Sequence, residues 1–197
     1  MYKLIKVLLI SAFLNSVCWI ILTPIWQFPD EQSHFAQIQD IAEIGSVPTN
    51  GPDTSREIAF SEEVMGTARD EMGNNKYTYH PDYHNPYSAD SYFGPQEKEI
   101  STLQKSARNE LVKDESTQNP PLYYFFASAV YKAFSWGYLF TRVFAIRFLS
   151  TIFFLMTLIL IYKIGQKVFA KSQILPIATV STVAFMPMFA YVSSGLL

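Results

Sequence analysis

Apolar residues gather near the two ends of this 197-residue chain, and a long polar stretch separates them. Residues 1–26 form a first apolar run that begins with Lys3 and Lys6 and is long enough to cross a bilayer, which takes about 20 residues. Thr23-Pro24-Ile25-Trp26 offers no small-residue cleavage site, so a retained transmembrane helix is favoured over a cleaved signal peptide. The two lysines predict a cytoplasmic N-terminus.

The pattern that follows predicts an amphipathic helix over residues 29–44. Phe35, Ile38 and Ile41 recur at helical spacing and would form one apolar stripe. Pro29 suits the first position of a helix. An apolar stripe directly after a transmembrane segment is typical of a helix that lies along a membrane surface, and that is the expectation here.

The rest of the polar stretch predicts little packed structure. Prolines and glycine mark residues 46–61 as a loop, and residues 77–95 hold tyrosines and prolines without a helical period. Residues 62–72 and 97–115 are helix-permissive but polar on nearly every face, which is typical of solvated helices or a linker. Residues 27–141 are therefore expected to form a large external loop, and loops of such length usually have a function.

A second apolar region is too long for one transmembrane helix and admits two interpretations. In a four-span interpretation residues 121–140 also cross the membrane, and burying Lys132 there costs about 2.5–3.5 kcal/mol. In a three-span interpretation the segment 120–140 lies at the outer surface, where its tyrosines and tryptophan suit the interface, and residues 142–166 cross inward. The three-span interpretation is favoured because it avoids that cost and keeps the lysines after residue 162 on the cytoplasmic side.

A third apolar run, residues 173–197, is expected to return outward, with Pro187 as a position for a kink. No charged or polar flank follows this run, so the chain is expected to be the opening part of a larger polytopic protein. The predicted fold class is an all-α polytopic membrane protein with about three transmembrane helices and a large external first loop that carries interfacial helices.

Composition narrows the function classes further. With 15 basic and 17 acidic residues the chain is nearly neutral, which argues against nucleic acid as a partner. Its one cysteine, Cys18, lies in the first apolar run, so no disulfide or zinc knuckle can form within one chain. A transporter is disfavoured because the predicted spans hold almost no ionisable residue.

Asp30 and Glu31, at the mouth of the first span, are the strongest candidates for chemistry. A carboxylate fixed there could act as a general base on an acceptor hydroxyl, or hold a divalent cation near a phosphate. The alternative is that both acids merely cap a helix. His34 follows Asp30 by one helical turn, so the two side chains can share a face.

Two further groups of residues could bind ligands. His80, Asp82 and His84 alternate, and in an extended chain they could ligate zinc, although such a short motif is usually incidental. Arg142 and Arg147 border the second span on its outer side, where they could meet either a phosphate or lipid headgroups.

The order of the motifs resembles that of the GT-C glycosyltransferases. The closest likeness is to bacterial relatives of protein O-mannosyltransferases and of the aminoarabinose transferase of lipid A, and to bacterial membrane proteins with a Pro-Asp-Glu-x-x-His opening. Residues 47–117 lie outside the likeness. The motifs that carry it are Pro29-Asp30-Glu31-x-x-His34-Phe35, Asn119-Pro120-Pro121-Leu122-Tyr123-Tyr124, Arg147-Phe148-Leu149-Ser150 and Lys167-Val168-Phe169.

The resemblance implies a multi-pass enzyme of the inner (plasma) membrane that transfers a sugar from a polyprenyl-phosphate carrier to an envelope acceptor on the outer face. It implies that Asp30 is the catalytic base or the ligand of a divalent metal ion, with Glu31 as its neighbour. The substrate-binding residues that it suggests are His34, Asn119, Pro120, Tyr123 and Arg147.

Two departures from the family pattern bear on this expectation. Many relatives carry Lys or His where Asn119 stands, at a position associated with the carrier phosphate. They also have a second acidic site in the next external loop, which would lie beyond Leu197, so these residues alone are not expected to be active. The alternative function is that of a non-catalytic polytopic membrane protein whose external loop binds a partner.

Overall fold

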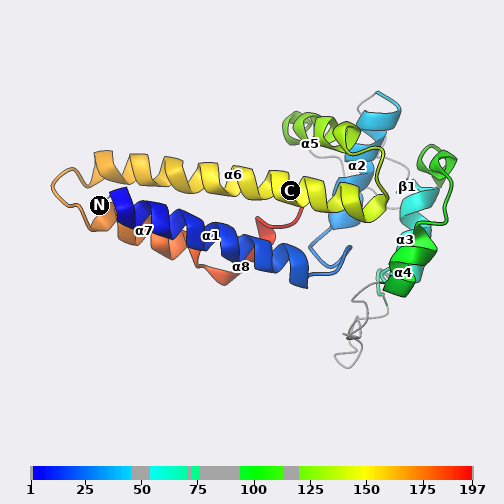
Figure 1. Ribbon diagram of the computed structural model, residues 1–197, viewed down its shortest axis with the longest axis horizontal. Coiled ribbons are helices and arrows are strands. Elements are labelled where there is room, and N and C mark those ends of the chain that lie inside the picture. The colour runs from blue at the N-terminus through cyan, green and yellow to red at the C-terminus, as the bar shows by residue number, and fades with distance from the viewer. Residues whose placement is uncertain (1, 46–53, 71, 76–93, 113–119, 197) are drawn as a thin grey trace. The chain divides into compact units, whose positions relative to one another are not determined.

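The computed structural model describes residues 2–45, 54–70, 72–75, 94–112 and 120–196 (Figure 1). These residues form eight α-helices, a short 3-10 helix and one pair of two-residue strands. The chain divides into two compact units, of which unit 1 comprises Met1–Thr23 and Ile146–Leu197, and unit 2 comprises Pro24–Ala145. The all-α prediction therefore holds apart from the small strand pair.

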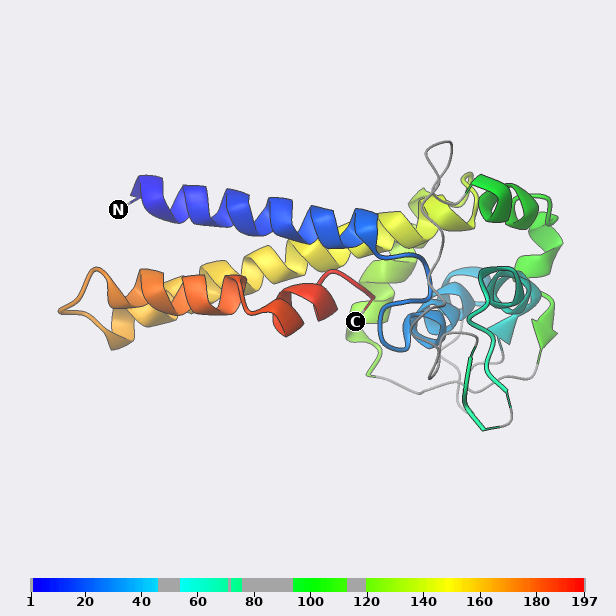
Figure 2. The same cartoon turned by 90° about the horizontal axis from the view of Figure 1, so that it is seen from below.

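Unit 1 is a bundle of apolar helices, of which two are long (Figure 2). It contains α1 (Tyr2–Leu22), most of α6 (Leu139–Val168), α7 (Leu175–Ala184) and α8 (Pro187–Val192). Both α1 and α6 are long and apolar enough to cross a membrane. Side chains from three helices form the core of this bundle, namely Ile5, Leu8 and Ala12 of α1, Phe154, Leu158 and Tyr162 of α6, and Val180 and Ala184 of α7.

The bounds of the two long helices differ from the predicted ones. α1 ends at Leu22, so residues 23–26 are not part of the first span, and Trp26 is buried in unit 2. α6 covers the predicted second span, residues 142–166, and extends it at both ends. Apolar length thus identified both helices, while their ends depend on the chain around them.

The third apolar run is not one continuous helix. α7 ends at Ala184 and α8 begins at Pro187, with Met186 in an extended conformation between them. Pro187 lacks the N–H that a continuing helix needs, which explains the break. α7 has 10 residues and would be about 15 Å long, half of the ~30 Å hydrocarbon core. Among the residues described, α1 and α6 are thus the candidate membrane spans, and a third crossing stays a prediction.

Unit 2 is built from short helices. They are α2 (Glu31–Glu43), α3 (Arg56–Met65), α4 (Gly94–Ile100), the 3-10 helix η1 (Lys105–Arg108), α5 (Leu122–Ala133) and the start of α6. Strands β1 (Thr54–Ser55) and β2 (Leu111–Val112) pair in antiparallel fashion, with Thr54 opposite Val112. This pairing brings the start of α3 next to the segment that follows η1.

α2 is buried on most of its faces. It begins and ends close to the predicted bounds, and Phe35 and Ile38 are fully buried as the apolar stripe requires. However, the polar side chains of Gln37, Gln39 and Asp40 are also buried. α2 thus differs from a simple amphipathic helix, because α5 packs against it and polar positions are buried as well. Its predicted place along a membrane surface stays a prediction.

α3 replaces part of a predicted loop and part of a predicted solvated helix. Ser55 caps its start, since the Ser55 side chain accepts a hydrogen bond from Ile58 N at 3.3 Å, and Gly66 ends it in the left-handed conformation. Glu57, Ile58 and other inward residues are buried. The solvated assignment of this segment is wrong, and hydrophobic periodicity could not reveal its buried side because three of the five buried residues, Glu57, Ser61 and Glu62, are polar.

α5 bears on the two interpretations of the second apolar region. With 12 residues it would be about 18 Å long, too short to cross a bilayer. Tyr124 and Tyr131 are buried on one side of α5, whereas Leu122, Phe125 and Phe126 are exposed on the other. The exposed apolar side could meet either lipid or another protein surface, so the interfacial segment over residues 120–140 stays a prediction.

Candidate functional site

The connection from α1 to α2 holds Asp30 in an unusual backbone conformation. Trp26 and Asp30 have positive φ angles, 64° and 52°, which cost of order 1–3 kcal/mol for residues other than glycine. Glu31 Oε2 accepts a hydrogen bond from Trp26 N at 2.8 Å, and the indole Nε1 of Trp26 donates to Ser61 Oγ at 2.9 Å. Such strain persists only where surrounding contacts enforce it, so packing around Trp26 fixes the position of Asp30.

The Asp30 carboxylate faces solvent. Asp30 occupies the N-cap position of α2, yet its side chain makes no capping hydrogen bond. It accepts a hydrogen bond from Arg69 Nη2 at 3.3 Å, and the side chains of Asp30 and Arg69 are 56% and 41% exposed. The capping alternative therefore does not hold for Asp30. An exposed ion pair contributes only about 0–1 kcal/mol, so Arg69 holds Asp30 weakly.

Glu31 lies in a different environment from Asp30. Its side chain is fully buried, and its carboxylate binds the backbone of the connection through Trp26 N. Glu31 thus holds the loop that presents Asp30, and the structure gives it no exposed carboxylate with which to meet a substrate.

His34 links α2 to the beginning of α5. Its Nδ1 lies 2.5 Å from the Tyr124 hydroxyl and the two rings stack, while Tyr123 meets Tyr124 edge to face. Burial lowers the pKa of His34 below 6.5, and the nearby carboxylates of Asp30 and Glu31 oppose this shift without overcoming it. His34 is therefore neutral at pH 7 and can either donate to or accept from Tyr124.

The structure brings only part of the predicted site together. Asp30 and His34 lie one turn apart on α2, and Tyr123 lies on α5 beside the partner of His34. Pro120 is exposed two residues before α5. The predicted residues Asn119, His80, Asp82 and His84 fall outside the described residues.

Arg147 does not face a phosphate or a lipid headgroup. It belongs to unit 1, is fully buried, and its Nη1 donates to the carbonyl oxygens of Ile20 at 3.1 Å and Thr23 at 2.7 Å. The last carbonyls of a helix have no partner within it, so Arg147 serves as a cap for α1. The prediction that Arg147 meets a phosphate or lipid headgroups is therefore wrong.

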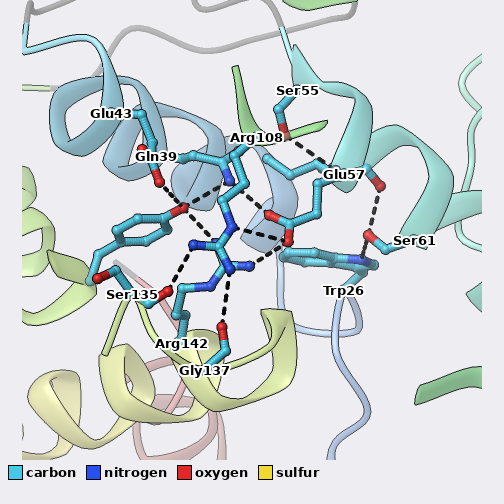
Figure 3. A network of polar contacts seen from close by, with 12 residues as sticks. Trp26, Gln39, Glu43, Ser55, Glu57, Ser61, Arg108, Ser135, Gly137 and Arg142 are labelled. Atoms are coloured by element: carbon cyan, nitrogen blue, oxygen red, sulfur yellow. Dashed lines mark hydrogen bonds and ion pairs between the residues drawn. The ribbon is translucent and has the colours of Figure 1, made fainter. Parts of the chain in front are cut away.

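Arg142 is likewise buried, as part of a polar network that sequence reasoning missed (Figure 3). Its Nη2 donates to Glu57 Oε1 and its Nη1 to the Tyr131 hydroxyl at 2.5 Å. The guanidinium also lies 4.9 Å from the centre of the Tyr131 ring, in cation–π geometry. The expectation that Arg142 meets phosphate or lipid is wrong, because its charge is neutralised inside unit 2.

Arg108 and Gln39 extend this network to further elements. Arg108 Nε lies 3.6 Å from Glu57 Oε1, and its two terminal nitrogens donate to the carbonyls of Ser135 and Gly137 at 2.9 and 3.1 Å. Gln39 Nε2 donates to Glu57 Oε2 at 2.9 Å and to the Tyr131 hydroxyl at 3.0 Å. Glu57 thus joins η1, α2 and α6 through side chains (Figure 3).

Tyr131 completes the network as a proton donor. Its hydroxyl donates to Glu43 Oε1 at 2.9 Å while accepting from Arg142. Burial raises the pKa of Tyr131 well above its usual range, and the opposing effect of Arg142 is smaller. Tyr131 therefore keeps its proton. Three of its buried atoms, Gln39 Oε1, Arg108 Nε and Arg142 Nε, have no hydrogen-bond partner among the described residues. We interpret the network as a structural one that holds the elements of unit 2 together, because it is buried and its hydrogen bonds join its own members.

A divalent ion at Asp30 stays a prediction. In the part of the chain that the structure describes, no three His, Cys, Asp or Glu side chains gather as metal ligands, and the charged neighbour of Asp30 is an arginine. Comparisons with protein-family models, curated proteins and solved structures find no match. The function is therefore argued from the geometry around Asp30.

Proposed function

We propose that this protein is an integral membrane glycosyltransferase of the GT-C type, which transfers a sugar from a polyprenyl-phosphate carrier to an envelope acceptor. The observation that carries the proposal is the exposed carboxylate of Asp30. A strained backbone holds it away from the helix-capping geometry, and buried contacts of Glu31 and Trp26 keep it there. Strained residues that their surroundings enforce cluster at functional sites.

Asp30 would act as the general base. It would accept the proton of the acceptor hydroxyl as that oxygen bonds to the anomeric carbon of the sugar. The bond from the anomeric carbon to the carrier phosphate oxygen breaks, and its electron pair leaves on the phosphate. The products are the glycosylated acceptor and polyprenyl phosphate. A positioned general base contributes about 10²–10⁴-fold to such a rate.

The neighbours of Asp30 suit the other parts of the substrate. Arg69 supplies a positive charge 3.3 Å from Asp30, and it can pair with the carrier phosphate. The exposed side of α5, with Leu122, Phe125 and Phe126, offers an apolar surface to a polyprenyl chain. His34 and Tyr123 would line the sugar side, and Asn119 and Pro120 stay proposed contacts that precede α5.

The proposal includes a membrane orientation. α1 and α6 would cross the inner membrane with their lysine-bearing ends in the cytoplasm, and unit 2 would face outward. α7 and α8 together would make a broken third crossing, for which a proline-interrupted helix is tolerated in membranes.

The experiment is a lipid analysis of cells that lack the gene and carry the full-length gene or a variant. Liquid chromatography with mass spectrometry measures polyprenyl-phosphate-linked sugars in their lipid extracts. Cells with Asp30→Asn should accumulate a carrier-linked sugar that wild-type cells consume, at equal amounts of protein in the membrane. Asparagine keeps the size of the side chain but cannot accept the proton.

Glu63→Gln is the matched control, because Glu63 is an exposed acid of unit 2 on α3 with no part in the site. It should leave the carrier pool at the wild-type level. Equal pools in deleted and wild-type cells, or an Asp30→Asn strain that matches Glu63→Gln, would overturn the proposal. The second result would favour a non-catalytic protein that binds a partner.

A further inference from the structure

A polar cavity lies within unit 1, where α6 ends and α7 begins. Its volume is about 230 Å³, and it is lined by Tyr162, Gln166, Ala170, Ser172, Gln173 and Pro176. The two helices come close beside it, since a Cβ atom on Gly165 would lie 3.2 Å from Pro176 Cα. Cavities that enclose whole small molecules usually measure about 300–1,000 Å³, so this one suits a smaller group.

The Tyr162 hydroxyl is the unusual feature of this cavity. Tyr162 is only 8% exposed, and its hydroxyl has no hydrogen-bond partner within the described part of the chain. Leaving a buried polar group unpaired costs about 1–3 kcal/mol, so such groups are normally satisfied. A bound ligand that accepts a hydrogen bond would remove this penalty.

The charges around the cavity are all of one sign. The segments that make up unit 1 contain no Asp or Glu. Lys163, Lys167 and Lys171 are exposed, and each directly follows a lining residue in the chain. On α6 the lining residues Tyr162 and Gln166 are one turn apart, so Lys163 and Lys167 form the adjacent stripe. No carboxylate of unit 1 neutralises them.

This end of the bundle also carries the lysines of α1. The start of α1 and the connection between α6 and α7 lie at the same end of unit 1 (Figures 1 and 2). Lys3 and Lys6 are exposed there. A single-sign cluster attracts anions, and basic pockets between transmembrane helices bind the headgroups of anionic lipids.

We propose that this cavity binds the phosphate headgroup of an anionic lipid from the leaflet around the lysine-bearing end. The Tyr162 hydroxyl donates a hydrogen bond to a phosphate oxygen, and the flanking lysines neutralise the headgroup. The acyl chains lie outside the cavity along the apolar helices. The inference rests on α1 and α6 crossing a membrane, and it is independent of sugar transfer.

Native mass spectrometry of the purified full-length protein tests the inference, with phosphatidylglycerol and phosphatidylcholine as probes. Phosphatidylglycerol should bind more tightly. Replacing Lys163 or Lys167 by glutamine should weaken its binding about fivefold each, which corresponds to about 1 kcal/mol per lysine. Tyr162→Phe should also weaken phosphatidylglycerol binding, because phenylalanine cannot donate the hydrogen bond to the phosphate oxygen.

Lys3→Gln is the matched control, since it removes one charge, as each single lysine variant does, at the same end of the bundle away from the cavity lining. It should retain most phosphatidylglycerol binding. An equal loss in this control would overturn the inference in favour of general surface attraction. So would displacement of the lipid by millimolar inorganic phosphate, or wild-type binding by Tyr162→Phe. Gln166→Ala is a second cavity variant if Tyr162→Phe does not fold.

Discussion

The buried network of unit 2 leads to a quantitative prediction for Glu57→Gln. Glu57 is the carboxylate that Arg142 and Arg108 share, and Arg142 is fully buried. Glutamine keeps the shape of the side chain but removes its charge. The substitution leaves two buried guanidinium groups without the counter-ion that they share, and therefore it should destabilise unit 2 strongly.

The magnitude follows from the burial of the pair. Removing one partner of a buried ion pair costs about 3–5 kcal/mol, because the other charge stays desolvated and unpaired. At about 1.4 kcal/mol for each factor of ten, the opening equilibrium of unit 2 should rise by roughly a hundredfold to a few thousandfold.

Hydrogen–deuterium exchange of the purified protein, followed by mass spectrometry, measures this opening through peptides of α2 and α3. Arg56→Gln is the control, because it breaks the exposed pair between Arg56 and Glu110 at 2.9 Å. An exposed pair contributes about 0–1 kcal/mol, so exchange should rise at most about fivefold in this control. If Glu57→Gln exchanged as slowly as Arg56→Gln, Glu57 would not be the essential counter-ion and our interpretation of the network would fail.

Two further predictions concern unit 2 and unit 1 in turn. The pKa of His34 is lowered in the folded protein, so the unfolded chain binds the proton more readily. The stability of unit 2 should therefore fall as the pH drops from above 6.5 towards that lowered pKa. A pH series of exchange rates should show this fall in the wild type, and an equally steep fall in His34→Gln would contradict the prediction. In unit 1 the Ser16 hydroxyl lies 2.7 Å from the hydroxyls of both Thr151 and Ser194. Ser16→Ala should therefore lower the free energy of unfolding, measured by reversible unfolding, by about 0.6–2 kcal/mol. Thr157→Ala, at an exposed position, should leave the free energy of unfolding almost unchanged.

Sequence reasoning worked where the deciding signal is local. α1 and α6 were found because an apolar run of membrane length needs no knowledge of its neighbours. Pro187 marked the break between α7 and α8 for the same reason, since the ring acts on its own helix turn. The position of Asp30 between α1 and α2 was also predicted, though its left-handed backbone was not.

The errors arise where distant residues decide the outcome. The first part of α3 was predicted as a loop from the prolines and glycine before it, and the second part as solvated chain. The burial of Glu57 becomes favourable only through Arg142, 85 residues later. Arg147 was assigned to phosphate or lipid from its place at one end of a helix, whereas its partner carbonyl on Ile20 lies 127 residues earlier. Polar side chains take their environment from tertiary partners, which hydrophobic periodicity does not record.

The most direct test of the proposed function is the initial rate at which membranes with the full-length protein release polyprenyl phosphate from a radiolabelled polyprenyl-phosphate sugar. The sugar is one that accumulates in cells lacking the gene. We predict that Asp30→Asn lowers this rate by about 10²–10⁴-fold, as expected for a general base, while Glu63→Gln leaves it unchanged. A rate for Asp30→Asn equal to that of the wild type would contradict the assignment of Asp30 as the catalytic base.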